Sequence, residues 1–400
     1  MPSPRSQPPR RVAFMLDLQW PYKRHTGIFA GAQRYAEAHA WESTIDDYIA
    51  EKLPQRKSAT VPYDGIIARA TKKLLRRAAH LNIPLVNVWM ASPVWRQLPG
   101  VFPDCETTGR LRAEHLLSRG LRRFAVFGNG QQASKIEVTA FKQVVSRAGF
   151  PCHVLQLPLR PRRSFAQWQK FENRIAQALT HWQLPIGVFA FSDDVGRVIA
   201  QLCRVRGWRV PHDVAIIAGS NEESHCEHPR PSLTSIEFGF ERIGYEAAQL
   251  LDQLMQARTS NARRRTAPKH LFLPPIGLVV RESSDFFAVD DPTIAAALEF
   301  IAANSQRQIN AADVARATHV GLRTLQRQFS EYLQRSISAE IQRVRIERAK
   351  RELTQSSRSV NEIARDVGFG RAMRMYEAFR RELGVAPRDY RKLRQLDKEP

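Results

Sequence analysis

Cysteine is scarce in this chain. The 400 residues include only four, Cys105, Cys152, Cys203 and Cys226, and each stands far from the others. Structural zinc sites and redox sites draw their thiols from short paired spacings, which these positions do not offer. The sequence therefore predicts buried free thiols in a reducing compartment, no metal site and no cofactor.

Long apolar segments are also missing near the start of the chain. It begins MPSPRSQPPRR, and the apolar run that follows, Val12 to Leu16, has only five residues. That run is too short for a signal sequence or a membrane-spanning helix. We therefore expect a cytoplasmic protein that does not enter a membrane, with a disordered basic tail over residues 1–10.

Acidic residues are outnumbered. The chain carries 39 Asp and Glu against 61 Lys and Arg, a net charge of +22. This balance favours a polyanionic partner such as double-stranded DNA. Residues 286–400 hold 21 basic and 15 acidic residues, so the excess is not concentrated there. The charge supports nucleic-acid binding without locating it.

From residue 11 to about 285, short apolar runs alternate with helical segments. Strands buried on both faces and separated by helices are typical of a parallel α/β sheet. We predict two α/β lobes, the first over about 11–103 and 232–258, the second over about 104–231 and 270–282, with an exposed loop at 257–269. The predicted strands are residues 12–16, 64–68, 84–89, 123–128, 153–157, 187–191 and 214–219.

The C-terminal segment has a different pattern. Val360, Ile363, Ala364 and Val367 follow the spacing of one helix face, and Gly368 ends that helix. A second helical run with a basic side follows at 371–383. This order of elements is typical of a helix-turn-helix, which lays its second helix in the DNA major groove. A surface hairpin with solvated arginines is the alternative for one such unit.

The same pattern occurs upstream, over residues 311–329. Fourteen residues separate Ala315 from Phe329, and fifteen separate Ala364 from Phe379. Between the two units, residues 337–353 form a glycine-free run that favours a stiff connecting helix. We therefore predict an all-α domain over 286–395, with helix-turn-helix units at about 311–332 and 360–382.

This domain resembles the DNA-binding domain of the AraC-type transcription regulators. The matching residues are Ile363-Ala364, Gly368-Phe369, Phe379, Gly384, Pro387 and Tyr390-Arg391. The resemblance implies that Arg323, Gln326 and Arg327 read bases in the first unit. Arginine can bind guanine, and glutamine adenine, through paired hydrogen bonds. The candidates in the second unit are Arg371, Met373 and Arg374, and the candidate phosphate contacts are Arg358, Arg388 and Arg391.

The larger part of the chain resembles the sugar-sensing domain of LacI/GalR-type regulators, a two-lobed fold like that of periplasmic binding proteins. The matching segments are 102–104, 115–128, 210–223 and 231–251. A sensor of this kind in front of an AraC-type domain is the arrangement of the XylR-type regulators of xylose operons, which the chain resembles from about residue 11 to 395. The resemblance implies a homodimer and allows a contact with RNA polymerase.

Ligands of open α/β sheets bind beyond the carboxyl ends of the strands. That rule selects polar and aromatic residues of the types that bind sugars, namely Asp17, Tyr22, Arg24, Trp89, Ser92, Asp193, Ser220 and Asn221. For each of them, a capping or core role is the alternative. The resemblance places Tyr22, Arg24, Asp193 and Asn221 at ligand-facing positions. It also shows two departures, because Ser220 replaces an aspartate and Glu137 replaces an arginine.

These patterns predict a sequence-specific DNA-binding regulator controlled by a small polyhydroxylated effector, such as xylose. One alternative is a DNA-binding regulator whose sensor domain is a dimerisation scaffold without a ligand. The other is a glycoside-processing enzyme using Asp193 and Asp194 or Glu222 and Glu223. Adjacent carboxylates usually point apart, and no nucleophile or phosphate-binding glycine loop accompanies them, so we expect no enzyme.

Overall fold

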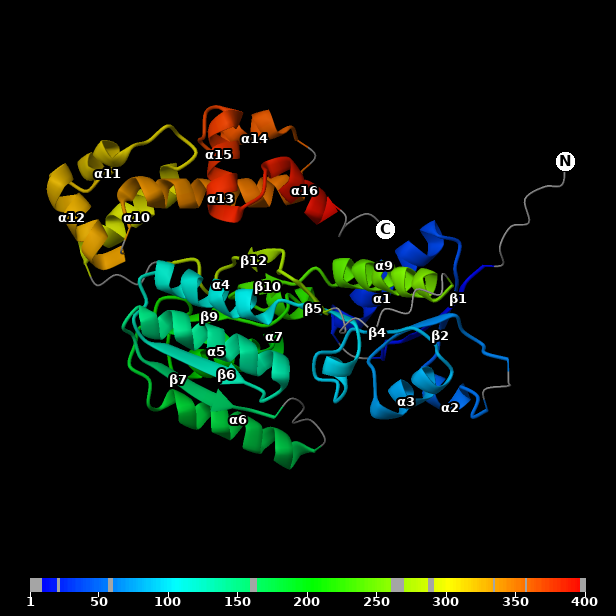
Figure 1. The fold of residues 1–400 in the computed structure, drawn as a ribbon. Helices are drawn as coiled ribbons and strands as arrows, with labels where there is room; N and C mark the ends of the chain where they lie inside the picture. The colour runs from blue at the N-terminus through cyan, green and yellow to red at the C-terminus, as the bar shows by residue number, and fades with distance from the viewer. Residues whose placement is uncertain are drawn as a thin grey trace. The chain divides into compact units, whose positions relative to one another are not determined.

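The computed structural model describes residues 9–19, 22–56, 60–158, 164–259, 270–286, 291–333, 335–356 and 358–395. These residues form two compact units, which are described separately (Figure 1). The first contains Met1–Arg110, Gly128–Ala140 and Ile236–Gly277, and the second contains the remaining segments. Residues 1–8 of the predicted tail and residues 260–269 of the predicted loop lie outside the described residues.

The first unit is built on a parallel sheet of six described strands. Their order is β11-β5-β4-β3-β1-β2, and the neighbouring strands pair in parallel. Every residue of β3 and β4 is buried, which agrees with the predicted two-sided burial. The strands are β1 (Arg11–Met15), β2 (Glu42–Ile45), β3 (Gly65–Ala68), β4 (Leu85–Asn87), β5 (Gly100–Pro103) and β11 (His270–Leu273).

Helices cover both faces of this sheet (Figure 1). The long helices α1 (Lys23–Ala38) and α9 (Phe240–Thr259) pack together on one face. The shorter α2 (Ile49–Lys52) and α3 (Lys72–His80) bury Ile49 and Leu74 against the other. A single turn, η1 (Trp95–Gln97), precedes β5.

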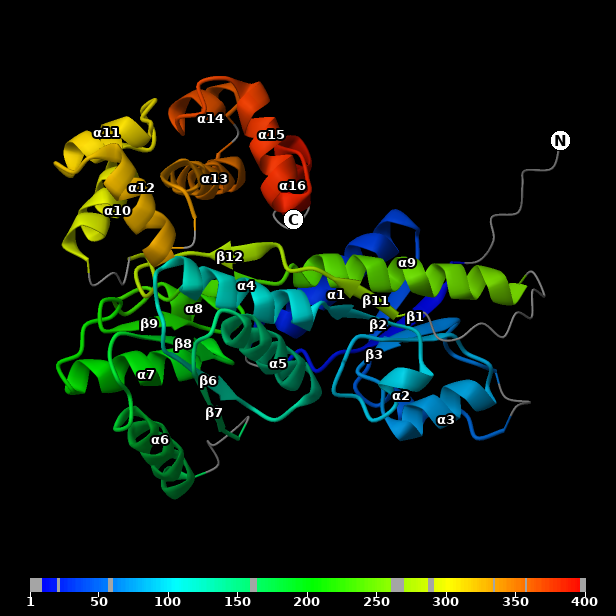
Figure 2. The same cartoon turned by 60° about the vertical axis from the view of Figure 1, so that its left-hand side comes forward.

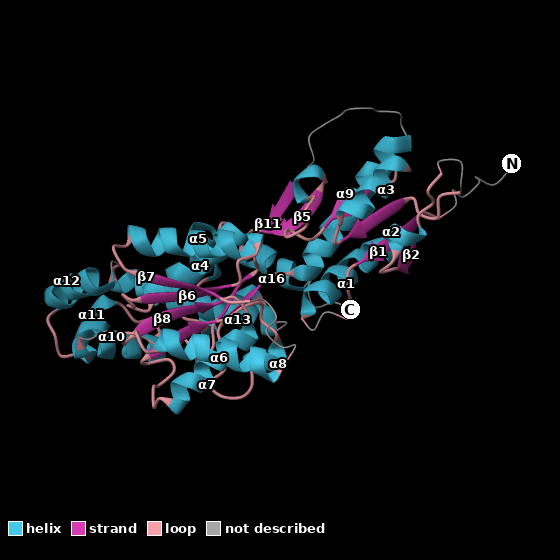
Figure 3. Ribbon diagram, turned by 90° about the horizontal axis from the view of Figure 1, so that it is seen from below, coloured by secondary structure: helices cyan, strands magenta, loops and turns pink. Residues whose placement is uncertain are grey.

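The second unit begins with a four-stranded sheet in the order β7-β6-β8-β9. Its strands are β6 (Phe124–Gly128), β7 (Cys152–Gln156), β8 (Ile186–Ala190) and β9 (Val214–Ile217). Helices α6 (Phe165–Leu179) and α7 (Asp193–Val205) lie on one face, and α4 (Cys105–Ser118) and α5 (Gln132–Arg147) on the other (Figure 3). The short α8 (Glu223–Cys226) follows β9, and β10 (Ser235–Glu237) pairs with β12 (Gly277–Val279).

Two details differ from the sequence-based expectation. Residues 270–273 were expected in the second lobe, but they form β11, which pairs with β5 in the first sheet. Strand β2 was not expected at all. It is an edge strand whose residues are mostly exposed, so it lacks the apolar run that marked the inner strands.

The C-terminal part of the second unit is all helical. Its helices are α10 (Pro292–Asn304), α11 (Ala311–Ala317), α12 (Leu322–Leu333), α13 (Ile337–Gln355), α14 (Val360–Asp366), α15 (Ala372–Leu383) and α16 (Pro387–Gln395). Figure 2 shows α13 between α11 and α12 on one side and α14 to α16 on the other. Ile341 of α13 packs in the core of the first helix-turn-helix half, and Ile346 packs in the core of the second. This helix therefore belongs to both halves, as the connecting run predicted.

The two halves repeat each other in geometry. Helices α11 and α14 have 7 residues each, and α12 and α15 have 12 each. Both short helices begin with a capping box, Asn310 with Asp313 and Ser359 with Glu362. The predicted duplication is therefore a duplication of structure. Among the described helices, none has the length and apolar character needed to cross a membrane.

The two helix-turn-helix units carry different residues at one left-handed position of their turns. Gly368 has a φ of +92° in the second turn, and His319, with a φ of +55°, occupies the same place in the first. A side chain in this left-handed region costs about 1 kcal/mol relative to glycine. Because His319 is exposed, we expect His319→Gly to raise the free energy of unfolding by about that amount, as measured by chemical denaturation. An unchanged or lower value would contradict this account of the turn.

Candidate DNA-binding surface and effector site

The exposed face of α12 carries the three predicted base-reading residues of the first unit. Arg323, Gln326 and Arg327 are exposed, whereas Leu325 and Phe329 on the opposite face are fully buried. Positions three and four residues apart lie on one side of a helix. The fold therefore presents two guanidinium groups and one amide group together on the surface of the predicted recognition helix.

The second unit presents a similar face at the start of α15. Arg371, Met373 and Arg374 are exposed, and Met373 is 69% accessible to solvent. An exposed methionine next to two arginines has the chemistry to contact a thymine methyl group. Glu377 is also exposed, one turn further on. The second surface is therefore less positive than the first.

A groove with charged, polar and apolar walls lies between the two halves. It has a volume of about 320 Å³, and Arg345 of α13 and Arg374 and Arg381 of α15 contribute to its walls. Arg345 donates to the carbonyl oxygens of Ser305 and Arg307, so its charge is held in place. The basic surface of α15 therefore continues toward α13.

Arg391, a predicted phosphate contact, is bonded within its own domain. It is partly buried, and its guanidinium group donates to the carbonyl oxygens of Leu353 and Arg358. These bonds join α16 to the end of α13. Arg358 forms ion pairs with Asp366 and Glu352, whereas Arg388 is exposed. Of the three predicted phosphate contacts, Arg391 and Arg358 thus have partners within the domain, and Arg388 is exposed.

In the first compact unit, a residue that the strand-end rule had not selected contacts both Asp17 and Trp89. Arg69 follows β3, forms a 2.8 Å ion pair with Asp17 and places its guanidinium group 4.7 Å from the centre of the Trp89 ring. One side of Trp89 is thus covered by a cation. Asp17 has a φ of +53°, a strained conformation often found at binding sites. Extending the rule to the end of the 64–68 strand would have found Arg69.

Of the other predicted residues of this unit, Ser92 is buried and its hydroxyl donates to the Ala70 carbonyl oxygen, whereas the remaining three are half-buried. Tyr22 is the N-cap residue of α1, Arg24 lies over the Phe240 ring at 5.5 Å, and Glu137 belongs to α5. His25 of α1 is buried, and its Nδ1 lies 2.9 Å from the Asp17 carbonyl oxygen. Burial lowers the pKa of His25 to about 4, so it adds no positive charge beside Arg69 near neutral pH.

In the second compact unit, Asp193 supports the loop after β9. Its side chain is almost completely buried and accepts hydrogen bonds from the backbone N–H groups of Ser220 and Glu222, at 3.1 and 2.9 Å, and from the Ser235 hydroxyl, at 2.7 Å. A carboxylate with three such donors supports the loop around it. The predicted ligand residues Asp193 and Ser220 are therefore joined directly.

Asn221 is held in the same loop from two sides. Its backbone has a φ of +59°, its N–H donates to Ser235, and its side-chain oxygen accepts a 2.8 Å hydrogen bond from Arg281. Arg112 of α4 is buried beneath the loop, donates to the Gly219 carbonyl oxygen and lies 4.3 Å from the centre of the Phe189 ring. Neither arginine carried a sequence signal, because each comes from a segment distant in the chain.

The structure gives the paired carboxylates no catalytic arrangement. Asp193 is engaged by the three donors described above, and Asp194 is the next residue of the same helix. Within the ranges that the structure describes, no group of His, Cys, Asp and Glu side chains could hold a metal ion.

Two parts of the chain match known domain families. Residues 113–284 match the periplasmic binding protein-like domain, and residues 314–393 match a helix-turn-helix domain. The chain is also 34% identical over 102 residues to a putative AraC-like transcription regulator of Streptomyces antibioticus, a match that covers 26% of this chain and 34% of that protein.

The similarity to other proteins extends over nearly the whole chain. It is 26% identical over 390 residues to the xylose operon regulatory protein of Escherichia coli strain K12, covering 95% of this chain and 96% of that one. A solved structure of the xylose-binding transcription activator xylR shares the fold, with a TM-score of 0.56 and 24% identity over 96% of this chain and 98% of that chain. These relatives are transcription regulators and not enzymes. The chain is therefore an AraC-family transcription regulator of the type that carries a periplasmic-binding-protein-like sensor domain in front of its helix-turn-helix units.

Proposed function

We propose that this regulator binds one DNA sequence through both helix-turn-helix units and that a small polyhydroxylated effector, such as a pentose, changes its affinity for that DNA. The observation that carries the first part is the repeated pair of helices with exposed base-reading side chains on α12 and α15. A connecting helix that packs in both cores fixes the two units in one relative orientation. Two recognition helices held in this way suit successive major-groove segments of one DNA face.

Arg327→Ala tests the proposed DNA contact. We expect affinity for a duplex selected from a random pool to fall about tenfold or more, with relaxed preference at one base position, because one good arginine–guanine pair discriminates by about 1–3 kcal/mol. Binding assays on the selected duplex and its single-base variants measure both effects. Arg316→Ala, an exposed arginine of α11, is the control and should preserve the base preference. Equal losses on selected and scrambled DNA would contradict the assignment.

The effector proposal rests on Asp17, Arg69 and Asn221 at the ends of parallel strands. Each of these groups, the carboxylate and guanidinium of the first compact unit and the amide of the second, is of a type that hydrogen-bonds sugar hydroxyls. Relatives named for xylose make D-xylose the first sugar to test. Ser220 stands in place of an acidic acceptor and Glu137 in place of a cation at two predicted positions. Other pentoses and hexoses are therefore tested alongside D-xylose.

A thermal-shift panel of pentoses and hexoses tests this proposal. A sugar that binds only the folded protein at one hundred times its Kd stabilises it by about 2.7 kcal/mol, so we expect a clear rise in Tm with one sugar. Asp17→Asn is the matched variant, because asparagine tolerates the left-handed backbone but removes the charge. It should keep its Tm without sugar and lose the shift. No shift with any sugar would favour the ligand-free dimerisation scaffold.

The proposed mechanism is a two-state one. The effector binds one arrangement of the sensor better than the other, and DNA affinity changes by the difference between the two binding free energies. We propose that the regulator acts in the cytoplasm as a homodimer, as its family implies, and that a contact with RNA polymerase follows DNA binding. Light scattering and size-exclusion chromatography measure the oligomeric state.

A further inference from the structure

One face of α13 is charged. Glu340, Arg343, Glu347 and Lys350 follow one another at intervals of three and four residues, which places them on one side of the helix. Ile341, Ile346, Ala349 and Leu353 are buried in the two helix-turn-helix cores. Glu340 has no solvent exposure, although ionised carboxylates are rarely buried without partners. The charged face is therefore covered, and its cover needs an explanation.

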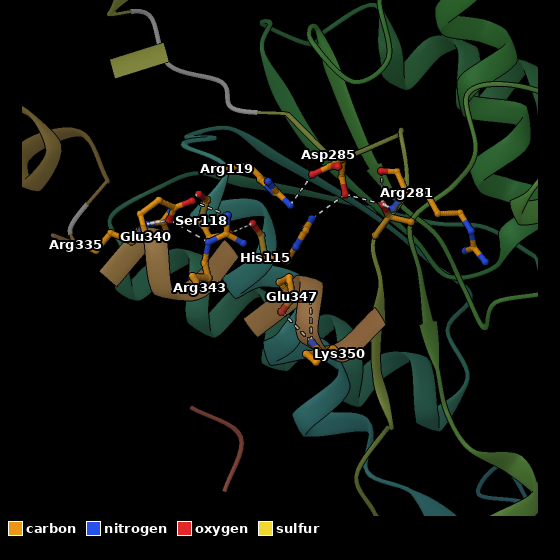
Figure 4. Close-up of polar contacts among 12 residues, drawn as sticks. His115, Ser118, Arg119, Arg281, Asp285, Arg335, Glu340, Arg343, Glu347 and Lys350 are labelled. Atoms are coloured by element: carbon orange, nitrogen blue, oxygen red, sulfur yellow. Dashed lines mark hydrogen bonds and ion pairs between the residues drawn. The ribbon is translucent and has the colours of Figure 1, made fainter. Parts of the chain in front are cut away.

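The end of α4 in the sensor domain provides that cover. Figure 4 shows His115, Ser118 and Arg119 next to the charged face of α13. Arg335, just before α13, donates to the carbonyl oxygen of Ser118. At one end of this contact, Arg122 of the sensor domain lies 5.7 Å from the ring centre of Tyr332, in the last turn of α12. The first DNA-reading helix is thus in contact with the sensor domain.

The charges on the two sides of this contact act on one another electrostatically. We call them the docking cluster and define it as Arg119 and Asp285 on the sensor side and Arg335, Glu340, Arg343 and Glu347 on the side of the DNA-binding domain. Arg119 pairs with Asp285 at 3.2 Å, and Glu340 pairs with Arg335 and Arg343 at 2.6 and 2.7 Å. Burial alone would raise the pKa of Glu340, but Arg343 and Arg335 hold it below its ordinary value. Glu340 is therefore ionised near neutral pH and offsets cations from both domains.

Burial of the cations makes the cluster depend on its carboxylates. The Arg119 side chain is only 4% exposed, and burial together with nearby Arg343 lowers its pKa to about 10. His115 is hydrogen-bonded to the Ser284 hydroxyl at 2.8 Å, and burial keeps its pKa well below the ordinary value. Without Glu340, the remaining arginines would repel one another in a region that water does not reach.

The cluster is also bonded to the loop that contains Asn221. At one end of the segment 281–285, the Arg281 guanidinium group donates to the side-chain oxygen of Asn221. At the other end, Asp285 forms an ion pair with Arg119. Between these ends, the Ser283 hydroxyl donates to the Ile216 carbonyl oxygen of β9. A short, fully bonded segment therefore joins the predicted effector loop to the contact with the DNA-binding domain.

We propose that the docking cluster is the surface through which the DNA-binding domain binds the second lobe of its own sensor domain, and that Arg119 and Glu340 are the positioning residues of this contact. This proposal does not rest on the proposed function, because it can be tested without knowing the operator or the sugar.

Hydrogen exchange of the full-length protein, measured by mass spectrometry without DNA or sugar, tests the proposal through its effect across domains. Arg119→Met, on the sensor side, should raise amide exchange at least about tenfold in residues 337–355 of the DNA-binding domain. Glu340→Gln, on the other side, should do the same in residues 111–119 of the sensor. A role confined to one domain would change exchange in that domain only, and that result would overturn the proposal.

Matched controls separate docking from folding. Asp366→Asn removes one exposed carboxylate of the same DNA-binding domain and should leave exchange in residues 111–119 unchanged. Arg122→Ala should raise exchange at 322–333, whereas Arg123→Ala should not, because Arg123 donates to Leu184 within the sensor. Both arginines are exposed, so these two variants keep the fold if Arg119→Met or Glu340→Gln does not. Equal exchange at 322–333 in both would then count against the docking surface.

Discussion

Replacing Gly368 with alanine is expected to lower the free energy of unfolding of the DNA-binding domain by about 3 kcal/mol or more. The residue has a φ of +92°, which costs a side chain about 1 kcal/mol. An added Cβ would also lie 2.1 Å from the Ser305 carbonyl oxygen and 2.8 Å from the Arg345 side chain. Because the first of these is backbone, α10 and the second turn must move apart, and such overpacking costs a further 1–3 kcal/mol or so.

Gly384→Ala is the control for this prediction. Gly384 also has a positive φ, +72°, but no atom lies within 4 Å of an added Cβ. We expect it to cost only about 1 kcal/mol, the conformational part alone. Urea denaturation of both variants measures the difference. Similar values for the two would show that the close approach of the turn to α10 does not contribute to stability.

Asp193→Ala is expected to have the second large effect, a loss of about 3 kcal/mol in the free energy of unfolding. The substitution leaves the N–H groups of Ser220 and Glu222 and the Ser235 hydroxyl without their acceptor. Each buried polar group left unpaired costs about 1–3 kcal/mol, reduced where water can enter. Denaturation followed by tryptophan fluorescence or circular dichroism measures the loss.

Asp193→Asn separates the loop-supporting role from direct contact with an effector. The amide oxygen can still accept both backbone bonds, so we expect a loss of only about 1 kcal/mol. If Asp193 only supports the loop, this variant should keep the sugar-induced rise in Tm. Loss of the rise with little change in stability would instead place the carboxylate on the ligand. A stable Asp193→Ala protein would contradict the structural role.

The DNA-binding half was more predictable from sequence than the effector site. Periodic apolar residues such as Ile363 and Phe379 mark helices directly, and repetition of the pattern gave both units. The first turn was harder to interpret, because His319 and not a glycine holds its left-handed position. An exposed polar residue at such a position leaves no mark in the apolar pattern.

The effector side shows the limit of local patterns. The strand-end rule selected polar residues, but the partners of those residues come from elsewhere in the chain. Asp17 pairs with Arg69, and Asn221 with Arg281. The charged face of α13 was present in the sequence at helical spacing. It was interpreted as an ordinary connector because its covering residues, around Arg119, lie more than two hundred positions earlier.

The shared helix α13 also restricts how this regulator can change over evolutionary time. One residue gained or lost in its middle would rotate everything beyond it by about 100° and shift it by about 1.5 Å. The second recognition helix, α15, would then face a different direction from α12. The charges of α13 would no longer lie opposite the residues of the sensor domain that they contact. Insertions and deletions should therefore be confined to the loops, while divergence in target sequence proceeds by exchanging single exposed side chains.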